Sequence, residues 1–378
     1  MGYHEEQKSQ VVVCVNKEIL QIKGLTIGYH SRRLAQEAKK HGYTFRGKVV
    51  AEKLFLNLAE GELVCLLGPN GSGKSTLMRT IAGVQKPICG HVMLDGKRLE
   101  KLSAKEVARH LSIVLTDRVM TGNLSVYALV TLGRYPYTGW MGSLSPDDEA
   151  IVRDAIETTG TRRFAHRHIS DLSDGERQKV MIARALAQDT PVILLDEPTA
   201  HLDLPNRIEV VRLLKKLARE QKKSIVMSTH ELDFALQAAD RIWLMSPAGG
   251  DDGKKGIEMI SGMPEELILD GRLEKAFKRN GFEFDRTSGS FRIHHHYKGS
   301  IGLFGEGMLA YWTKRALERI GYRVVRDASL PFRIEVSDEK GFGLWLCYDD
   351  SCRDAREIRD ICGVINHVKA KEKKLEIL

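Results

Sequence analysis

The stretch GPNGSGKST at residues 68–76 constrains the fold of this chain more than any other feature. An apolar run at residues 63–67 precedes it and a helix-like segment at residues 77–82 follows it, so strand, glycine loop and helix occur in that order. Glycines let successive backbone N–H groups surround phosphate oxygens, and the start of a helix adds positive dipole charge. The stretch therefore predicts a P-loop for a nucleoside triphosphate, with Lys74 at the β- and γ-phosphates and Ser75 on Mg²⁺. This order disfavours the alternative, a glycine turn with a surface lysine.

Composition is that of a globular protein with two domains. The chain has 378 residues, of which 29% are charged and 42% hydrophobic, and a domain usually takes roughly 150 residues. No run approaches the roughly 18 apolar residues of a membrane span, and the N-terminus lacks the apolar core of a signal peptide. We therefore expect the chain to stay in the compartment where it is made. The six cysteines are scattered, which favours reduced thiols over a disulfide framework.

The net charge of +8 permits an anionic partner, either nucleic acid or the inner face of a membrane. It does not discriminate between them, because Lys and Arg are spread along the whole chain. The one dense basic run, residues 369–374, is expected to be a solvated tail.

Strands and helices are expected to alternate around the P-loop. Apolar runs predict strands at residues 19–29, 49–58, 63–67, 90–96, 111–115, 192–195, 224–228, 242–245 and 256–260, the last two forming a hairpin. Capping boxes predict helices that begin after Ser145 and Ser173, and another helix is expected from Pro205. Residues 31–48 form a basic insertion with a short helix at 34–40. The pattern predicts an α/β core with a largely parallel sheet and a helical region at about residues 117–188.

Candidate catalytic groups follow two of the buried strands. Asp196 and Glu197 end the strand at 192–195, where Asp196 would bind Mg²⁺ and Glu197 would orient the attacking water as a general base. His230 follows the next strand, and strand ends of such sheets build sites. Strand-end carboxylates and a lone histidine are often only surface residues, but the P-loop upstream favours the catalytic interpretation.

Taken together, these motifs resemble those of ATP-binding subunits of ABC transporters over residues 12–293. LSDGERQ at residues 172–178 is similar to the signature sequence of that family, and AHLD at residues 200–203 is similar to its D-loop. The resemblance implies that Asp196 and Glu197 end the Walker B strand, that His230 is the switch histidine and that Tyr29 stacks on adenine. The residues expected at ATP and Mg²⁺ are Tyr29, Gly68, Pro69, Asn70, Gly71, Ser72, Gly73, Lys74, Ser75, Thr76, Ser173, Gly175, Glu176 and Asp196, with Lys74, Glu197 and His230 as the catalytic groups.

The resemblance also implies a head-to-tail homodimer. The start of the signature helix, at Ser173 and Gly175, offers backbone N–H groups to an anion. In the family this surface closes on the γ-phosphate held by the other subunit. Since this chain has one P-loop and one signature, two copies are needed for two complete ATP sites.

A narrower resemblance is to importers of ferric siderophores, haem and cobalamin, carried by LGRYPYTG at 132–139, LSPDD at 144–148 and TAHLD at 199–203. It implies an ATPase at the inner face of the cell membrane that works with a permease and, indirectly, a substrate-binding protein. Two alternatives stay open: the ATPase of another ABC transporter class, and a soluble ABC ATPase that acts on nucleic acid. The second usually needs tandem P-loops or a coiled-coil insertion, so nucleic acid is not an expected partner.

Two departures from the family pattern bear on the site. Thr116 stands where the family places a glutamine that contacts Mg²⁺ and the attacking water, so either Thr116 or Asp117 is expected to reach the metal. Asp174 and Glu176 replace the commoner glycine and glutamine of the signature. Extra carboxylates there should weaken phosphate binding slightly unless basic residues screen them.

Residues 298–378 extend beyond the resemblance and predict an accessory α+β domain. We expect a strand at 301–304, a helix at 308–320, a hairpin of 332–336 with 342–346 and a helix at 353–364. The glycines at 302–307 do not have dinucleotide-loop spacing. The three adjacent histidines at 294–296 cannot all face one metal on a strand, and Cys347, Cys352 and Cys362 lack zinc-ligand spacing. Regulation, dimer contact or ligand sensing remain the expected roles.

Overall fold

The structure, a computed structural model, describes residues 17–29, 48–116, 124–139, 142–247, 256–277, 282–286, 289–293, 297–339, 342–349 and 352–375. The chain forms two units, residues 1–278 with 284–290 and residues 279–283 with 291–378. Apart from Lys48, the predicted insertion at 31–48 lies outside the described residues, so its helix stays a prediction.

The centre of the first unit is a six-stranded sheet in the order β10-β9-β3-β8-β7-β6. Its strands are β3 (Leu63–Leu67), β6 (Leu111–Val114), β7 (Val192–Leu195), β8 (Ser224–Thr229), β9 (Arg241–Pro247) and β10 (Ile257–Gly262). All neighbours pair in parallel except β10, which forms the predicted antiparallel hairpin with β9. Every residue of β3, β7 and β8 is buried, as expected of parallel strands covered on both faces.

A second, antiparallel sheet in the order β2-β1-β4-β5 lies beside the P-loop helix. It consists of β1 (Glu18–Tyr29), β2 (Lys48–Ala59), β4 (Cys89–Leu94) and β5 (Lys97–Arg98). The P-loop helix, α2 (Lys74–Ile81), places Leu77 and Met78 in a core shared with this sheet and with Trp243 of β9. Both sheets therefore hold α2, and with it the glycine loop, in place.

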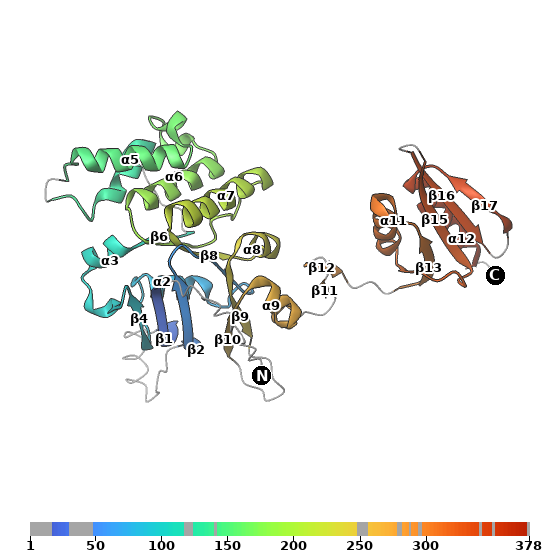
Figure 1. Ribbon diagram of the computed structural model, residues 1–378, viewed down its shortest axis with the longest axis horizontal. Helices are drawn as coiled ribbons and strands as arrows, with labels where there is room; N and C mark the ends of the chain where they lie inside the picture. The colour runs from blue at the N-terminus through green and yellow to red at the C-terminus, as the bar shows by residue number, and fades with distance from the viewer. Residues whose placement is uncertain are drawn as a thin grey trace, which may run out of the picture. The chain divides into compact units, whose positions relative to one another are not determined.

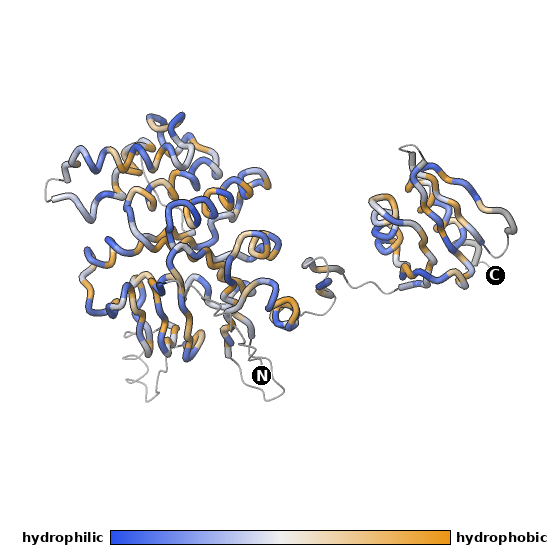
Figure 2. The backbone as a smooth tube through the Cα atoms, viewed as in Figure 1, coloured by the Kyte–Doolittle hydropathy of each residue, from blue (hydrophilic) through white to orange (hydrophobic). Residues whose placement is uncertain are grey.

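Helices cover the rest of the first unit. They are α3 (Ala104–His110), α4 (Val126–Thr131), α5 (Pro146–Thr158), α6 (Asp174–Ala187), α7 (Leu204–Gln221), α8 (Leu232–Ala238), α9 (Pro264–Leu269) and α10 (Arg272–Phe277). Ser145 and Ser173 form the predicted capping boxes. Helices α5 and α6 lie at the end of the unit away from β1, β2 and β4 (Figure 1), and hydrophobic and hydrophilic stretches alternate along the helices (Figure 2). Such amphipathic helices bury one face each.

The second unit is built on a five-stranded sheet in the order β14-β13-β15-β16-β17. Its elements are β13 (Gly299–Phe304), α11 (Gly307–Arg319), β14 (Tyr322–Val325), β15 (Phe332–Glu339), β16 (Phe342–Asp349), β17 (Cys352–Ile358) and α12 (Ile361–Leu375), preceded by the paired strands β11 (Phe282–Asp285) and β12 (Ser290–Ile293). Strand β13 pairs in parallel with β14 and β15, whereas β15, β16 and β17 pair antiparallel. The predicted α+β class and the hairpin of β15 with β16 are confirmed.

One prediction for this unit was wrong in part. The first half of the segment predicted as a helix at 353–364 is strand β17, because pairing with β16 satisfies its backbone groups and overrides its local helical pattern. The helix α12 begins only at Ile361 and continues to Leu375, so the whole basic run at 369–374 is helical, and its first residues, Lys369 and Ala370, are exposed as expected of a solvated run. Val364 and Val368, four residues apart, are buried on one face of α12 and attach it to the sheet.

A buried hydroxyl joins α11 to this sheet, and its removal should weaken the unit. Thr313 is fully buried and its Oγ1 accepts a hydrogen bond of 2.7 Å from Trp345 Nε1. We expect Thr313→Val to lower the free energy of unfolding of this unit by ~1–3 kcal/mol, because the indole N–H is left without a partner. Urea unfolding checks this, with Thr313→Ser as the control that keeps the hydroxyl. An unchanged midpoint for Thr313→Val would show that the bond contributes nothing.

Candidate functional site

The P-loop requires glycine at Gly73 for both conformation and space. Gly73 precedes α2 with φ 103°, in the left-handed region that side chains rarely adopt. A Cβ atom there would lie 2.2 Å from Val50 Cγ1 on β2. The loop therefore packs directly against β2, and no larger residue fits without displacing it.

Lys74 is held beneath the loop. Its side chain is buried, and its Nζ donates hydrogen bonds to the carbonyl oxygens of Gly68 at 2.9 Å and Pro69 at 3.3 Å. Burial lowers the pKa of Lys74, while the charges of Glu197 and Asp196 act in the opposite direction. The ammonium group is thus held against the carbonyl oxygens of the loop itself, and a lysine of this motif is expected to neutralise phosphate charge.

A cavity of about 670 Å³ opens over the P-loop. This volume lies within the ~300–1,000 Å³ range of small-molecule sites. The residues that line it are Tyr29, Lys48, Val49, Val50, Asn70, Gly71, Gly73, Lys74, Ser75, Thr76, Glu197, Gly256 and Ile257. The Tyr29 hydroxyl lies 2.9 Å from Thr76 Oγ1, which ties the tyrosine to α2, and about half of Tyr29 is exposed. Of the predicted site residues, Tyr29, Asn70, Gly71, Gly73, Lys74, Ser75, Thr76 and Glu197 therefore border one cavity, whereas Gly68, Pro69, Ser72, Asp196 and His230 are not among its lining residues.

Asp196 and Glu197 follow β7 and share a partner on β8. The Ser228 hydroxyl donates to Asp196 Oδ1 at 2.6 Å and accepts a hydrogen bond from the Glu197 backbone N–H at 2.9 Å. Asp196 is buried and Glu197 has a positive φ of 49°. His230 Nδ1 lies 3.7 Å from Glu197 Oε1, so the histidine expected at this site is beside the carboxylate.

Thr116 contacts the chain just after β7. Its Oγ1 donates a hydrogen bond of 2.9 Å to the backbone oxygen of Asp196. Asp117, the other residue expected to reach the metal, lies outside the described residues. The hydroxyl of Thr116 is thus engaged in holding the strand end, a contact that the sequence did not predict.

The signature residues do not line this cavity. Ser173 caps α6, and Glu176 accepts hydrogen bonds from the Ser173 backbone N–H and hydroxyl, both at 3.0 Å. Both bonds lower the pKa of the Glu176 carboxyl, and the bond from the Ser173 backbone N–H has the larger effect. Arg177 lies 3.0 Å from Asp174, so both extra carboxylates already have partners. A Cβ atom at Gly175 would lie 2.6 Å from the Asn206 side chain, so α7 packs closely against the start of α6 and Asn206 would have to move to admit a larger residue.

Several residues of the site carry no signal in the sequence. The sequence pattern marks Ser228 only as part of a strand, and its place beside Asp196 follows once β7 and β8 are known to be neighbours. Lys48, Gly256 and Ile257 border the cavity from the ends of β2 and β10, and no motif marks them.

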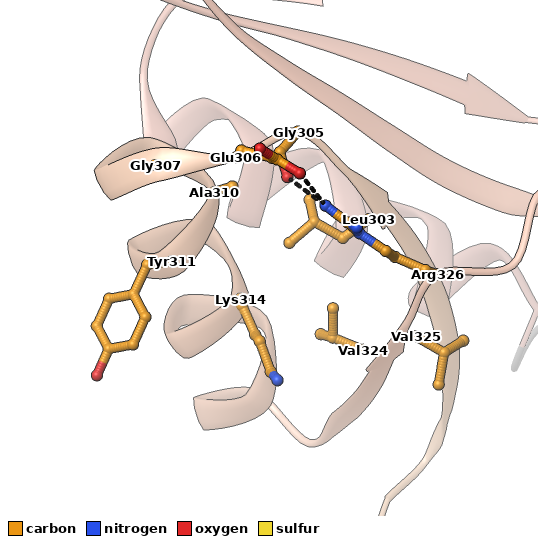
Figure 3. Close-up of a pocket in the computed structure, with 10 residues that line it drawn as sticks. All are labelled: Leu303, Gly305, Glu306, Gly307, Ala310, Tyr311, Lys314, Val324, Val325 and Arg326. Carbon is orange, nitrogen blue, oxygen red and sulfur yellow. Dashed lines mark hydrogen bonds and ion pairs between the residues drawn. The ribbon is translucent and has the colours of Figure 1, made fainter. Parts of the chain in front are cut away.

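A second cavity, of about 470 Å³, lies in the C-terminal unit between α11 and β14 (Figure 3). Leu303 and Val324 give it apolar walls, and Lys314 extends along it from α11. Arg326 reaches across from the end of β14 to Glu306, with Nη2 3.1 Å from Oε1. Among the described residues, no group of three or more His, Cys, Asp or Glu side chains is arranged to hold a metal ion.

Two family models match the chain. Residues 51–200 match the model described as ABC transporter, and residues 298–369 match the model described as Iron ABC transporter C-terminal domain. Within the described residues, no helix is both long and apolar enough to pass through a bilayer.

The chain is similar to several relatives over most of their length. The uncharacterized ABC transporter ATP-binding protein MJ0873 of Methanocaldococcus jannaschii is 43% identical over 65% of this chain and 82% of that protein. The petrobactin import ATP-binding protein FpuD of Bacillus anthracis is 39% identical over 65% of this chain and 86% of that protein. The iron(3+)-hydroxamate import ATP-binding protein FhuC of Bacillus subtilis is 35% identical over 63% of this chain and 85% of that protein.

Solved structures agree with this fold. The chain is similar to cbiO1 from Clostridium perfringens, part of the ABC transporter complex cbiONQ, with a TM-score of 0.54 and 26% identity over 68% of this chain and 96% of that one. It is also similar to the dimeric structure of MJ0796, a bacterial ABC transporter cassette, with a TM-score of 0.50 and 29% identity over 60% of this chain and 93% of that one. The chain therefore belongs to the ATP-binding proteins of ABC transporters and is an ABC-type ATPase that binds ATP.

Proposed function

We propose that this chain powers import of an iron–siderophore, haem or cobalamin-type substrate through a separate membrane permease, from the inner face of the cell membrane. The observation that carries the proposal is the match of residues 298–369 to the Iron ABC transporter C-terminal domain. Relatives named for petrobactin and iron(3+)-hydroxamate import support an iron complex. A relative named for cobalamin import, from Halobacterium salinarum, 34% identical, keeps a corrinoid as the second candidate.

Uptake by cells tests the substrate. A strain without this chain should lose uptake of ⁵⁵Fe-labelled siderophore, and the parent chain should restore it, whereas a Glu197→Gln chain should not. Labelled cobalamin is measured in the same strains. Loss of cobalamin uptake with normal iron uptake would reverse the order of the two candidates, and normal uptake of both would reject import of either.

For the chemistry, we propose that Glu197 accepts the proton of the attacking water and that His230 beside it orients the γ-phosphate. Lys74, already fixed under the loop, would neutralise charge on the β- and γ-phosphates. The residues also fit Mg²⁺, which prefers hard oxygen ligands. Ser75, which borders the cavity, offers its hydroxyl. Buried Asp196 accepts the Ser228 hydroxyl at Oδ1 and has Oδ2 as its second carboxylate oxygen. When bound, Mg²⁺ supplies positive charge that stabilises the transferring phosphoryl group.

For the assembly, we propose a head-to-tail homodimer that closes on two ATP. The start of α6 at Ser173 and Gly175 does not border the chain's own P-loop cavity, which supports its use by a second copy. Helix N-termini attract phosphate oxygens through free N–H groups and the helix dipole. The relative MJ0796 forms dimers, and another structure of it holds ADP and Pi in a post-hydrolysis state.

Thr116 should affect communication with the permease more than ATP binding. We expect Thr116→Gln to leave ATP affinity unchanged but to alter permease-stimulated ATPase, because it removes the bond to the Asp196 carbonyl and adds a longer side chain. Binding is measured on the isolated chain and stimulated turnover on the reconstituted transporter. Thr116→Ser, which keeps the hydroxyl, is the control. Equal stimulated rates in Thr116→Gln and parent would contradict this role.

A further inference from the structure

We propose that Ser228 is a positioning residue that sets the geometry of both Asp196 and Glu197 through a single hydroxyl. The proposal rests on the catalytic and metal roles proposed above for these two carboxylates. Ser228 is fully buried near the end of β8, and parallel pairing of β7 with β8 places it beside Asp196. It lies outside the ATP cavity lining, so it acts through the carboxylates and not by contact with ATP.

The direction of the two hydrogen bonds follows from what each group has to offer. The Glu197 backbone N–H can only donate, so the Ser228 oxygen must accept from it across 2.9 Å. The one hydrogen of the hydroxyl is then free for Asp196 Oδ1, 2.6 Å away. This distance lies within the usual range for a hydrogen bond between a hydroxyl and a carboxyl oxygen. Ser228 therefore fixes Asp196 Oδ1 as an acceptor and leaves Oδ2 without a bond to this hydroxyl.

The same serine steadies the backbone that carries Glu197. Glu197 has φ 49°, a left-handed conformation that is unfavourable for a residue with a side chain. Its N–H bond to Ser228 compensates for that strain at the point where the chain turns out of β7. This conformation places the Glu197 carboxylate on the border of the ATP cavity and within 3.7 Å of His230. Without the hydroxyl, both the turn and the Asp196 carboxylate lose a fixed partner.

The chain supplies a matched control on the same strand. Ser224, at the start of β8, is also fully buried, and its Oγ accepts a hydrogen bond of 3.1 Å from the Gly61 backbone N–H. Ser224 contacts neither carboxylate. Replacing each serine with alanine removes a buried hydroxyl that accepts one backbone N–H, but only Ser228→Ala disturbs the proposed catalytic pair.

We expect Ser228→Ala to lower kcat for ATP hydrolysis ~10–100-fold, the range typical for residues that orient metal ligands, with little change in KM for ATP. Ser224→Ala should keep the parent kcat. A readout other than turnover is Mn²⁺ binding in the presence of a non-hydrolysable ATP analogue, followed by electron paramagnetic resonance. Its affinity should fall ~10–100-fold in Ser228→Ala and stay unchanged in Ser224→Ala. Ser228→Cys, which fills the same space with a weak donor, should behave as Ser228→Ala and serves if the alanine variant does not fold.

The outcomes separate this inference from the proposed function. If Glu197→Gln abolishes turnover but Ser228→Ala matches Ser224→Ala in kcat and Mn²⁺ affinity, Ser228 is only a packing residue and the inference fails. If Glu197→Gln leaves turnover intact, the proposed catalytic role itself fails. Loss of turnover and of Mn²⁺ affinity specific to the Ser228 variants supports the inference.

Discussion

The Glu197→Gln chain should hydrolyse Mg-ATP ~10²–10⁴-fold more slowly than the parent, the range expected when a general base is removed. Glutamine keeps the size of the side chain but cannot take a proton from water. Glu197 borders the cavity together with Lys74 and lies beside His230. Among the described residues that line the cavity it is the one carboxylate, so no other lining residue can replace it as the base. Phosphate release under saturating ATP measures the effect.

Glu258→Gln is the control for charge removal. Glu258 is exposed on β10, and the two residues before it, Gly256 and Ile257, border the same cavity. It should retain parental turnover. Undiminished turnover in Glu197→Gln would remove Glu197 from the role of base, and an equal loss in both variants would point to a general electrostatic effect.

The second large effect is expected for Gly73→Ala, which should weaken ATP binding ~10²-fold or more. The positive φ of Gly73 costs alanine ~1–3 kcal/mol, and its Cβ would overlap Val50 at 2.2 Å, so the loop must move. Each 1.4 kcal/mol is about tenfold in affinity. Titration with a fluorescent ATP analogue measures the loss.

Gly71→Ala is the matched control in the same loop. Gly71 also has a positive φ, 81°, but a Cβ atom there meets nothing within 4 Å. It should therefore lose less affinity than Gly73→Ala, since it has the conformational cost without the overlap. Equal affinities in the two variants would mean that contact with β2 does not shape the loop. Melting temperatures of both variants exclude unfolding as the cause.

Local patterns predicted the first unit well because its signals are strong and mutually consistent. A P-loop fixes strand, loop and helix in order, apolar runs such as that at β7 are characteristic of strands buried on both faces, and capping boxes mark where α5 and α6 begin. The C-terminal unit lacks such motifs. There, β17 reads locally as a helix, and only its pairing with β16, a contact between segments, makes it a strand.

The candidate site likewise contains residues that the sequence predicts and contacts that it does not. The motif residues could be identified from spacing, and the structure brings Tyr29, Lys74 and Glu197 to one cavity. The contacts of Thr116 and Ser228 with Asp196 could not be predicted, because they depend on the register of β6, β7 and β8. Small hydroxyls at strand ends carry no sequence signal until the neighbouring strands are known.

In the proposed homodimer each copy completes the ATP site of the other, and molar mass tests this most directly. Light scattering of the Glu197→Gln chain should give 42.5 kDa without nucleotide and twice 42.5 kDa with Mg-ATP. Adding Gly175→Glu, which crowds Asn206 and brings negative charge to the start of α6, should return the mass to that of the monomer. A chain that stays monomeric with Mg-ATP, alone and beside its permease, would contradict the account.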